Sequence, residues 1–497
     1  MGVVIVVKLI LMGLFSSDYQ DKMFMPFVSA FLQGFNPYSY YFEHELLPSF
    51  PYFPLMLLIK SIDGGVVAVF QPKSIFVRNL LFKMSLLIFD MLGYWFLRKM
   101  HVGAKYAIIF YSCSPITLYA TFMHGQLDII PTVLLLGAVY FVTTWDNRHN
   151  LLWYAVFLGL AIGTKFHIIA ALPILFIYVA SKRGVMQSLK YTLYAMSIVV
   201  LLTVGFWGKG FAQTVLMNKE QAGLTSVAIS YGTTKLLIPI AVIFIIYAKT
   251  YGLEYFNRDL LCSLLGFLYA VFVICVPPMP AWFIWIVPYI ALYFSFVKKD
   301  KYKTMILYGC FNVLYLAYFV FLHRTEYVDI YFLGTSLQTW KIPNDQMKYI
   351  LFTLMATCLG MVICRIYSFG LLSNSLYKRG NIPFTIGIAG DSGTGKTKLL
   401  EKIGKLFGTD QNVLFIEGDG DHRWARNDEN WERFTALDPQ ANYLYKQAED
   451  IKALREGNHV YRSEYDHDTG LFRESQRVNV RKYIVLCGLH SLYLPQL

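Results

Sequence analysis

The stretch FTIGIAGDSGTGKT, residues 384–397, decides the fold of the C-terminal part of the chain. It begins with an apolar, β-rich run and continues into a glycine-rich loop of the pattern G-x-x-x-x-G-K-[ST]. A helical run from Lys398 to Leu406 follows. That strand–loop–helix context is what a phosphate-binding loop requires. We therefore predict an α/β domain with a parallel sheet that binds a nucleotide.

Each residue type in this loop has a physical reason to be there. Glycines let backbone N–H groups wrap the phosphates, and the helix N-terminus favours negative charge. Lys396 adds a positive charge on the phosphates and is also a candidate catalytic residue, and Thr397 is the expected Mg²⁺ ligand. The cofactors expected are thus ATP and Mg²⁺. The predicted ATP-binding residues are Gly390, Asp391, Ser392, Gly393, Thr394, Gly395, Lys396 and Thr397.

A second strand, residues 412–416, runs into the charged stretch EGDGDHRWAR, residues 417–426. Charged groups at the end of a central strand of an α/β sheet lie where ligands bind. Asp419 is well placed to accept a proton from a substrate hydroxyl, and Arg423 or Arg426 could hold a substrate phosphate. The alternative is an ordinary solvated turn at the end of a strand.

Taken together, residues 381–497 closely resemble the phosphoribulokinase/uridine kinase family. GDSGTGKT, D-x-x-H-R, TALDP, KALREG, Y-x-H-x-T-G and GLHSLY follow one another in that family's order. The resemblance implies ATP-dependent phosphorylation of a sugar or nucleoside hydroxyl, with Asp419 as the base and Mg²⁺ bridging the phosphates. It also implies that His422 and His467 take part in substrate binding.

Two departures from the family pattern affect the expected chemistry. Cys487 stands where the family has the glutamate that acts as the Walker B carboxylate, and a thiol is a poor Mg²⁺ ligand. The chain also stops at Leu497, soon after the last predicted strand, so this domain is expected to be incomplete. The alternative to an active kinase is a degenerate domain that only binds nucleotide, as a sensor or tether.

The rest of the chain has the composition of a membrane protein. Hydrophobic residues make up 56% of the whole sequence and charged residues only 15%, whereas soluble domains have close to 25% charged residues. Residues 381–497 hold 15 Lys+Arg and 17 Asp+Glu, which leaves residues 1–380 with 29 and 15. This division excludes a secreted protein and a nucleic-acid binder, and it predicts a multi-pass α-helical membrane domain followed by the P-loop domain.

The expected boundaries are a membrane domain over residues 1–370, a linker over 371–382 and a kinase-like domain over 383–497. Apolar runs long enough to span a bilayer suggest ten to thirteen membrane segments, one of them broken near residue 164. The short basic loops around residues 98–105, 182–190 and 298–303 fall on one side, which the distribution of basic residues marks as cytoplasmic. The C-terminal domain belongs on that side, and the loops 17–50, 207–231 and 323–347 face outward.

Unusual polar residues gather on the outward side. Asp18 and Asp21 follow the first apolar run, and Gln126 and Asp128 precede a long one. Ionisable groups at the mouth of a membrane helix are costly unless they serve a site or pathway. For Asp128 the alternative is a carboxylate favoured by the helix dipole, and for Asp18 and Asp21 it is a solvated loop. Asp90 is expected to be structural, paired with Lys83 or Arg98.

Residues 10–300 resemble the GT-C superfamily of integral-membrane glycosyltransferases, which use polyprenyl-phosphate sugars. The resemblance is carried by the acidic first outer loop, FPYFPL, SPITLYATFMHGQLD, GLAIGTKFHIIAALP and PPMPAWFIWIVPYI, in that order. It implies that an outer-loop aspartate acts as general base on the acceptor hydroxyl, with Asp18 the best match and Asp21 the second. Gln126 and Asp128 are the further candidates for substrate binding in this part.

The sequence thus favours an outward-facing, lipid-linked-sugar glycosyltransferase joined to a cytoplasmic P-loop kinase. Its expected partners are ATP, a sugar, sugar-phosphate or nucleoside substrate, a polyprenyl-phosphate sugar donor and the lipid bilayer, with no nucleic acid. One alternative is the transferase with a nucleotide-binding sensor tail. Another is a membrane transporter with an ATP-binding tail, although the sequence has no evident internal repeat.

Overall fold

The computed structural model describes the chain except residues 47–49, 145–147, 219–222, 254, 277–278, 298–300, 324–329, 338–341, 343, 375–382, 392, 408–411, 436, 467 and 495–497, and except the side chains of residues 148 and 419. It divides into two compact units, Met1–Leu371 and Leu372–Leu497.

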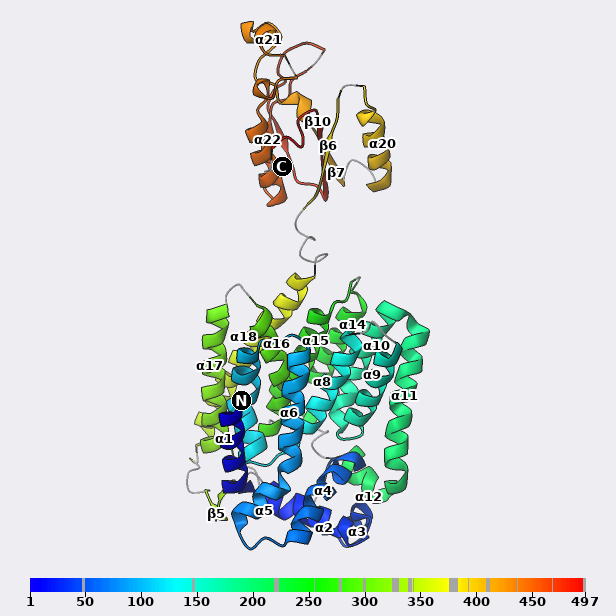
Figure 1. Ribbon diagram of the computed structural model, residues 1–497, viewed down its shortest axis with the longest axis vertical. Coiled ribbons are helices and arrows are strands. Elements are labelled where there is room, and N and C mark those ends of the chain that lie inside the picture. The colour runs from blue at the N-terminus through cyan, green and yellow to red at the C-terminus, as the bar shows by residue number, and fades with distance from the viewer. Residues whose placement is uncertain are drawn as a thin grey trace. The chain divides into compact units, whose positions relative to one another are not determined.

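The first unit is built from helices, which Figure 1 shows side by side in a bundle. Its helices are α1 (Gly2–Leu14), α2 (Met25–Leu32), α3 (Pro37–Glu43), α4 (Pro54–Phe70), α5 (Ile75–Phe82), α6 (Met84–Lys99), α7 (Ala104–Ala107), α8 (Ile129–Thr143), α9 (Arg148–Ile162), α10 (Leu172–Arg183), α11 (Val185–Thr203), α12 (Lys209–Phe211), α14 (Ile238–Tyr251), α15 (Arg258–Cys275), α16 (Val287–Phe296), α17 (Lys301–Ala317) and α18 (Asp345–Ser373).

Short strands and short 3₁₀ and π-helical segments connect these helices. The strands are β1 (Phe15–Ser17), β2 (Ala228–Tyr231), β3 (Thr234–Leu237), β4 (Ile330–Phe332) and β5 (Thr335–Ser336). β1 pairs with β4 in antiparallel fashion, so the first loop of the chain is tied to a segment more than 300 residues later. The turns used below are η1 (Tyr19–Phe24), η3 (Thr117–Met123), η4 (Phe166–Ala171) and η8 (Pro280–Ile286).

Five helices among the described residues are long and apolar enough to cross a membrane, or up to seven spans if each of two bent helix pairs is one span. That is fewer than the ten to thirteen expected from the apolar runs. Five further apolar helices have 10–17 residues. α8 is an example, because it has only 15 residues, of which 12 are buried. A short apolar helix inside a bundle has the composition of a membrane span without its usual length.

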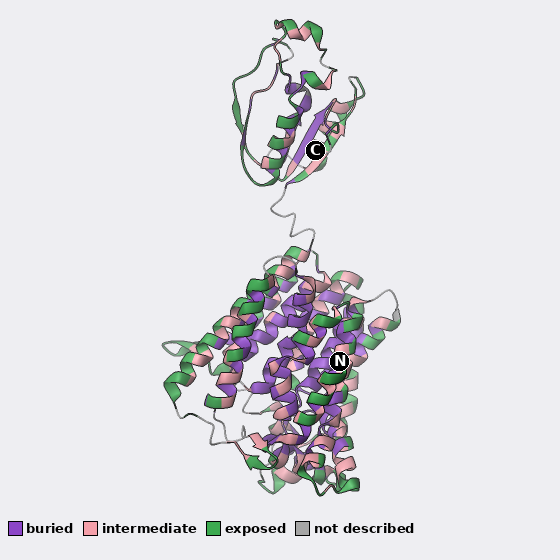
Figure 2. Ribbon diagram, turned by 60° about the vertical axis from the view of Figure 1, so that its left-hand side comes forward, coloured by how far each residue is buried: buried purple, intermediate pink, exposed green. Residues whose placement is uncertain are grey.

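Residues 15–70 gather at one end of the bundle, and α18 finishes at the other (Figure 1). The break predicted near residue 164 is present, because α9 ends at Ile162 and the 3₁₀ turn η4 precedes α10. Figure 2 shows the buried residues filling the middle of the bundle and the exposed ones on its outside. An exposed apolar exterior is the arrangement expected of a helical unit that lies in lipid.

The buried charges of the bundle are paired, in one case differently from the expectation. Asp90 pairs with Lys8 of α1, with Nζ and Oδ2 2.5 Å apart and both side chains fully buried. Neither Lys83 nor Arg98 is its partner. Lys83 instead donates to backbone carbonyls, including that of Phe15 at 2.6 Å and that of Phe122 at 3.2 Å. Lys8 thus satisfies one oxygen of the Asp90 carboxylate, and Lys83 satisfies a set of backbone carbonyls, which lowers the cost of burying these groups.

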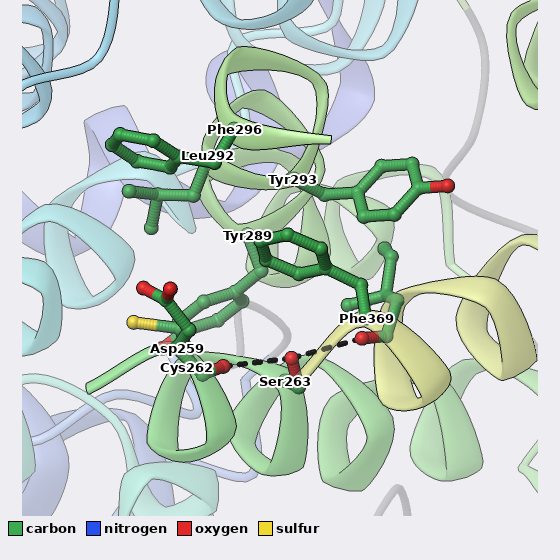
Figure 3. Close-up of a pocket in the computed structure, with 9 residues that line it drawn as sticks. Asp259, Cys262, Ser263, Tyr289, Leu292, Tyr293, Phe296 and Phe369 are labelled. Carbon is green, nitrogen blue, oxygen red and sulfur yellow. Dashed lines mark hydrogen bonds between the residues drawn. The ribbon is translucent and has the colours of Figure 1, made fainter. Parts of the chain in front are cut away.

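Near the end where α18 finishes, α15 and α18 pack closely around Ser263, which lines a small cavity with aromatic walls (Figure 3). The Ser263 hydroxyl donates to the carbonyl of Asp259 on its own helix at 2.7 Å and lies 3.0 Å from that of Ile366 on α18. Gly370 leaves room for this contact, because a Cβ atom there would lie 2.4 Å from the Ser263 hydroxyl oxygen. This cavity is a packing feature and holds no catalytic constellation.

The second unit is a small α/β domain around a three-stranded parallel sheet (Figure 1). Its elements are β6 (Phe384–Ala389), α20 (Lys396–Phe407), β7 (Val413–Glu417), α21 (Glu429–Arg433), α22 (Leu444–Arg455), β8 (Val460–Arg462), β9 (Gln476–Val478) and β10 (Tyr483–Gly488). The sheet order is β6-β10-β7, and β8 and β9 form a separate antiparallel pair. The predicted helical membrane-type region followed by a parallel-sheet P-loop domain is confirmed.

The two faces of this sheet are covered by different helices. Ile416, Ile484 and Leu486 form a buried cluster with Ile451 and Leu454 of α22. The alternate side chains of the strands point the other way, toward α20. Tyr483 stacks on Phe407 with ring centroids 4.4 Å apart.

Candidate functional site

The glycine-rich loop joins β6 to α20 and has the backbone that phosphate binding needs. Gly393 and Gly395 have φ values of 80° and 90°, in the left-handed region that only glycine adopts readily. These conformations turn the chain sharply between the carboxyl end of a strand and the N-terminus of a helix. The expected strand–loop–helix geometry is therefore present.

Lys396 lies at the start of α20 and folds back over the loop. Its Nζ donates to the backbone carbonyls of Gly390 at 2.6 Å and Asp391 at 2.8 Å. The Thr394 hydroxyl donates to the same Asp391 carbonyl at 2.8 Å. Thr397 lies exposed in the first turn of α20. Ser392 lies outside the described residues.

The end of β7 lies at the same carboxyl edge of the sheet. The short turn after β7, residues 418–420, holds the backbone of Asp419, whose side chain lies outside the described part of the structure. His422 is buried between the rings of Trp431 and Tyr465, with ring-centroid distances of 5.3 and 4.9 Å. Its ring therefore also belongs to the packing of this unit.

The two arginines expected to hold a phosphate are both exposed. The Arg423 guanidinium lies 5.3 Å from the centre of the Tyr443 ring. The backbone N–H of Arg426 donates to the carbonyl of Gly470 at 3.0 Å. His422, Arg423 and Arg426 all follow shortly after the end of β7, and His467 lies outside the described residues.

Asp421, directly after the turn at residues 418–420, takes part in a buried ion-pair network. Arg462 donates to Asp421 at 2.7 Å and to Asp450 at 3.0 Å. Gln447 donates to the same Asp421 oxygen at 2.9 Å. Burial raises the pKa of Asp450, although the neighbouring Arg462 opposes that shift. The network joins the β7 turn to α22 and β8.

Five stretches that are far apart in the sequence meet in the helical unit, at the end that holds residues 15–70. Ser17 donates to the carbonyl of His124 at 2.6 Å. The backbone N–H of Phe53 donates to the carbonyl of Thr164 at 3.0 Å. Tyr19 of the first loop contacts Met279, with its hydroxyl 3.8 Å from the sulfur. These are the same five stretches that carry the resemblance to membrane glycosyltransferases.

The first loop holds its two acidic residues in place rather than leaving them as a solvated turn. Asp18 has a side chain only 3% exposed; it accepts a hydrogen bond from Tyr331 at 2.6 Å and pairs with Lys22 at 2.8 Å. The hydrogen bond with Asp18 raises the pKa of Lys22. Asp21 accepts from Ser16 at 2.8 Å and lies 3.5 Å from Arg78.

Asp128 is fully buried at the centre of the meeting point. Oδ1 accepts from Lys165 at 2.6 Å and from the Trp285 indole at 2.9 Å, and Oδ2 accepts from Tyr52 at 3.3 Å. Asp128 is the N-cap residue of α8, where the helix dipole favours a carboxylate, and its side chain makes no capping hydrogen bond. Gln126 is buried beside it, and the Gln126 amide nitrogen has no hydrogen-bond partner among the described residues.

A cavity of about 440 Å³ opens next to this cluster. Its walls are mostly apolar and come from η4, α14 and the ends of α15 and η8, and Lys165, His167, Trp282 and Trp285 line its polar part. His167 stacks on Trp285 with ring centroids 3.8 Å apart. The Lys165 ammonium lies 5.0 to 5.8 Å from the rings of Tyr52, Trp285 and Trp282. Among the residues that the structure describes, the cavity therefore combines one cation with a large apolar lining.

Sequence reasoning missed the partners that fix these acids. Tyr331 lies 313 residues from Asp18 and Trp285 lies 157 from Asp128, so no local pattern connects them. Lys165 is a charged residue within an apolar run of the sequence. Burying a charge is costly without a partner, so this position is a signal that a buried partner exists.

Comparisons with known proteins bear mainly on the second unit. The model of the phosphoribulokinase/uridine kinase family matches residues 385–497. A phosphoribulokinase from Synechocystis sp. is 39% identical over 108 residues, which cover 22% of this chain and 32% of that protein. The chloroplastic phosphoribulokinase of Spinacia oleracea is 34% identical over 124 residues, covering 22% and 31%. The chain spans about a third of the length of these curated relatives.

One solved structure aligns with most of the chain. The crystal structure of ArnT from Cupriavidus metallidurans bound to undecaprenyl phosphate covers 93% of this chain and 91% of its own, with a TM-score of 0.43 and 11% identity. The described chain has a helical unit with several candidate membrane spans and a C-terminal domain that the phosphoribulokinase/uridine kinase family model matches, which confirms the predicted resemblance of that domain.

Proposed function

We propose that the C-terminal unit binds ATP with Mg²⁺ and transfers the γ-phosphoryl group to a hydroxyl of a sugar or nucleoside. The observation that supports this most directly is the loop at residues 390–397, with its two left-handed glycines between β6 and α20. The match to the phosphoribulokinase/uridine kinase family supports the same chemistry.

The roles follow from the positions along the carboxyl edge of the sheet. The loop N–H groups and the α20 N-terminus stabilise the phosphates, and Lys396 exchanges its carbonyl partners for phosphate oxygens. Mg²⁺, when bound, neutralises charge on the phosphates and is held in part by the Thr397 hydroxyl. Asp419 takes the proton of the substrate hydroxyl, and Arg423 or Arg426 holds a phosphate of the substrate.

The test is ATP turnover by detergent-purified protein with Mg²⁺, against a panel of nucleosides and sugar phosphates. Lys396→Ala should abolish nucleotide binding, and Asp419→Asn should abolish transfer while binding is retained. Lys398→Ala, an exposed lysine on the same helix, is the matched control and should keep both. Binding without turnover in the wild type would indicate a nucleotide-sensing tail and overturn the kinase proposal.

A second function is proposed for the helical unit: transfer of a sugar from a polyprenyl-phosphate donor at the outward-facing end. The meeting of five distant stretches around Asp128 supports it, beside a largely apolar cavity that has one cation among its described lining residues. An apolar cavity suits a lipid chain, and a lysine at its edge suits a phosphate.

In this proposal Asp18 is the general base that accepts the proton of the acceptor hydroxyl, with Asp21 as the second candidate. Its contacts with Tyr331 and Lys22 hold it in one orientation. Asp128 and Gln126 border the substrate, and Asp128 positions Lys165 for the lipid phosphate.

The test is sugar transfer by the purified protein from a panel of polyprenyl-phosphate sugars. Asp18→Asn should abolish transfer with little change in donor binding, and Asp21→Asn should lower it less. Asp345→Asn removes an exposed carboxylate at the start of α18 and serves as control. Donor uptake coupled to solute movement, without transfer, would favour a transporter instead.

A further inference from the structure

The position that carries the metal carboxylate in related kinases is occupied here by a thiol. Cys487 is buried near the end of β10, the central strand of the sheet. Mg²⁺ is a hard cation that takes oxygen ligands, so a cysteine does not fit the ion. Among the described residues no group of three or more His, Cys, Asp or Glu gathers as a metal site. A protein oxygen ligand for Mg²⁺ at the carboxyl edge of the sheet therefore has to come from a residue other than Cys487.

The sheet register identifies the nearest such donor. Cys487 lies opposite Glu417 on β7 and opposite Ile388 on β6. Neighbouring strands lie about 4.8 Å apart, and residues in register project to the same face. Glu417 is therefore the carboxylate-bearing neighbour of the Cys487 position, displaced by one strand.

Two contacts fix which face this is. Tyr483, four residues before Cys487 on β10, stacks on Phe407 of α20. Phe415, two residues before Glu417 on β7, lies 3.5 Å from where a Cβ atom of Gly404 on α20 would be. Because side chains alternate along a strand, Cys487 and Glu417 both project to the α20 face. The helix that covers this face, α20, holds Thr397 in its first turn.

The Glu417 carboxylate is accessible to a cation, whereas the nearby Asp421 carboxylate is already paired. It is exposed, and its carboxylate has no hydrogen-bond or ion-pair partner within the described part of the chain. Asp421, by contrast, is buried against Arg462 and Gln447. A carboxylate at the carboxyl edge of the sheet, on the α20 face and on the strand beyond β10 from the strand that leads into the phosphate loop, is suited to a divalent cation.

We propose that Glu417 supplies the carboxylate that holds the nucleotide-bound Mg²⁺, together with the Thr397 hydroxyl. In related kinases the residue at the position of Cys487 supplies this carboxylate. This inference rests on the proposed nucleotide binding and adds one residue to it. The metal site is thereby moved from the central strand β10 to its neighbour β7. Cys487 remains a buried packing residue under the site and ligates nothing.

The experiment measures ATP affinity of the full-length, detergent-purified protein by calorimetry, with Mg²⁺ and with EDTA. In the wild type Mg²⁺ should tighten ATP binding. Glu417→Gln should reduce this gain in ATP affinity by about tenfold or more, which is the scale observed when a residue that supports a bound metal is lost. Cys487→Ser should leave the gain unchanged. Glu417→Gln combined with Cys487→Glu should restore it, because the carboxylate then returns to β10.

Mn²⁺ gives a second readout that does not depend on turnover. The electron paramagnetic resonance spectrum of Mn²⁺ with ATP and protein should change in Glu417→Gln and not in Cys487→Ser. A Mg²⁺ gain that survives Glu417→Gln, or one lost in Cys487→Ser, overturns the inference, as does equal ATP affinity with and without Mg²⁺. Wild-type protein that binds no ATP under either condition overturns the proposed function as well, which separates the two failures.

Discussion

The buried ion pair of Asp128 and Lys165 is held by more contacts than the pair itself provides. Their atoms lie 2.6 Å apart, the carboxylate is fully buried, and it also accepts from Trp285 and Tyr52. A buried pair is weak evidence for net stabilisation, yet removing one partner leaves an uncompensated charge. The cavity beside Lys165 gives the pair a reason to exist other than packing.

We therefore predict that Lys165→Met destabilises the protein by about 3–5 kcal/mol, because it strands the Asp128 carboxylate. The double variant Asp128→Leu with Lys165→Met should recover most of that stability while donor binding stays lost. Thermal unfolding in detergent measures the first effect and lipid-phosphate binding the second. Lys105→Met, at an exposed lysine, is the control. Equal losses in the single and double variants would contradict the argument.

At this scale the sequence predicted the residue types but not their partners. The G-x-x-x-x-G-K-[ST] pattern predicted the turn between β6 and α20, because the glycines that form this turn lie close together in the sequence. The solvated loop considered for Asp18 is wrong, since β4 pairs with β1 and carries Tyr331 to it. The expected partners of Asp90 are wrong for the same reason: Lys8 comes from a helix 82 residues away.

At the scale of elements, the loop between β6 and α20 depends on its glycines. Gly395 has φ of 90°, and a side chain in left-handed backbone costs about 1–2 kcal/mol. Gly395→Ala should therefore weaken ATP binding by about tenfold, since the loop must shift and 1.4 kcal/mol is a factor of about ten. A fluorescent nucleotide titration measures this.

Gly404→Ala on the same helix is the matched control. Gly404 lies inside α20, and its added methyl group would only touch the Phe415 ring at 3.5 Å. Alanine favours helix over glycine by about 1 kcal/mol, so this variant should be more stable with unchanged ATP affinity. Equal affinities for the Gly395 and Gly404 variants would contradict the assigned loop geometry.

The contact between α15 and α18 is the second element-scale case (Figure 3). Gly370→Leu would place a Cβ atom 2.4 Å from the Ser263 hydroxyl oxygen and force the helices apart. We expect a loss of about 1–3 kcal/mol, typical of overpacking, measured as a lower unfolding temperature in detergent. Gly360→Leu on the same helix, with nothing within 4 Å of its Cβ position, should change little. An equal loss in both would contradict the packing argument, because leucine favours helix over glycine at either position.

Sequence patterns predicted elements better than their arrangement. The break near residue 164 follows from a lysine and glycine within an apolar run, and the structure has it between α9 and η4. Among the described residues, fewer helices reach the length of a full span than the apolar runs suggested, because several apolar helices have only 10–17 residues. The order β6-β10-β7 brings the last strand into the centre of the sheet, and no local pattern fixes that order. The role inferred for Glu417 depends on it.

At the scale of the whole molecule, the composition already separates two kinds of chain, and the structure divides between Leu371 and Leu372. The phosphoribulokinase/uridine kinase match lies entirely in the second unit. The stretches around Asp18 and Asp128 lie entirely in the first. Each proposed reaction therefore uses residues of one unit only.

This division predicts that the two activities can be removed one at a time in the full-length protein. Asp18→Asn should abolish sugar transfer and leave ATP turnover within about twofold of wild type, because surface or distant substitutions couple weakly. Lys396→Ala should do the reverse. Both activities are measured on the same detergent-purified preparations, and the double variant should lose both. If Lys396→Ala also halted sugar transfer, nucleotide binding in the second unit would control the first, and the two reactions would be coupled rather than merely joined in one chain.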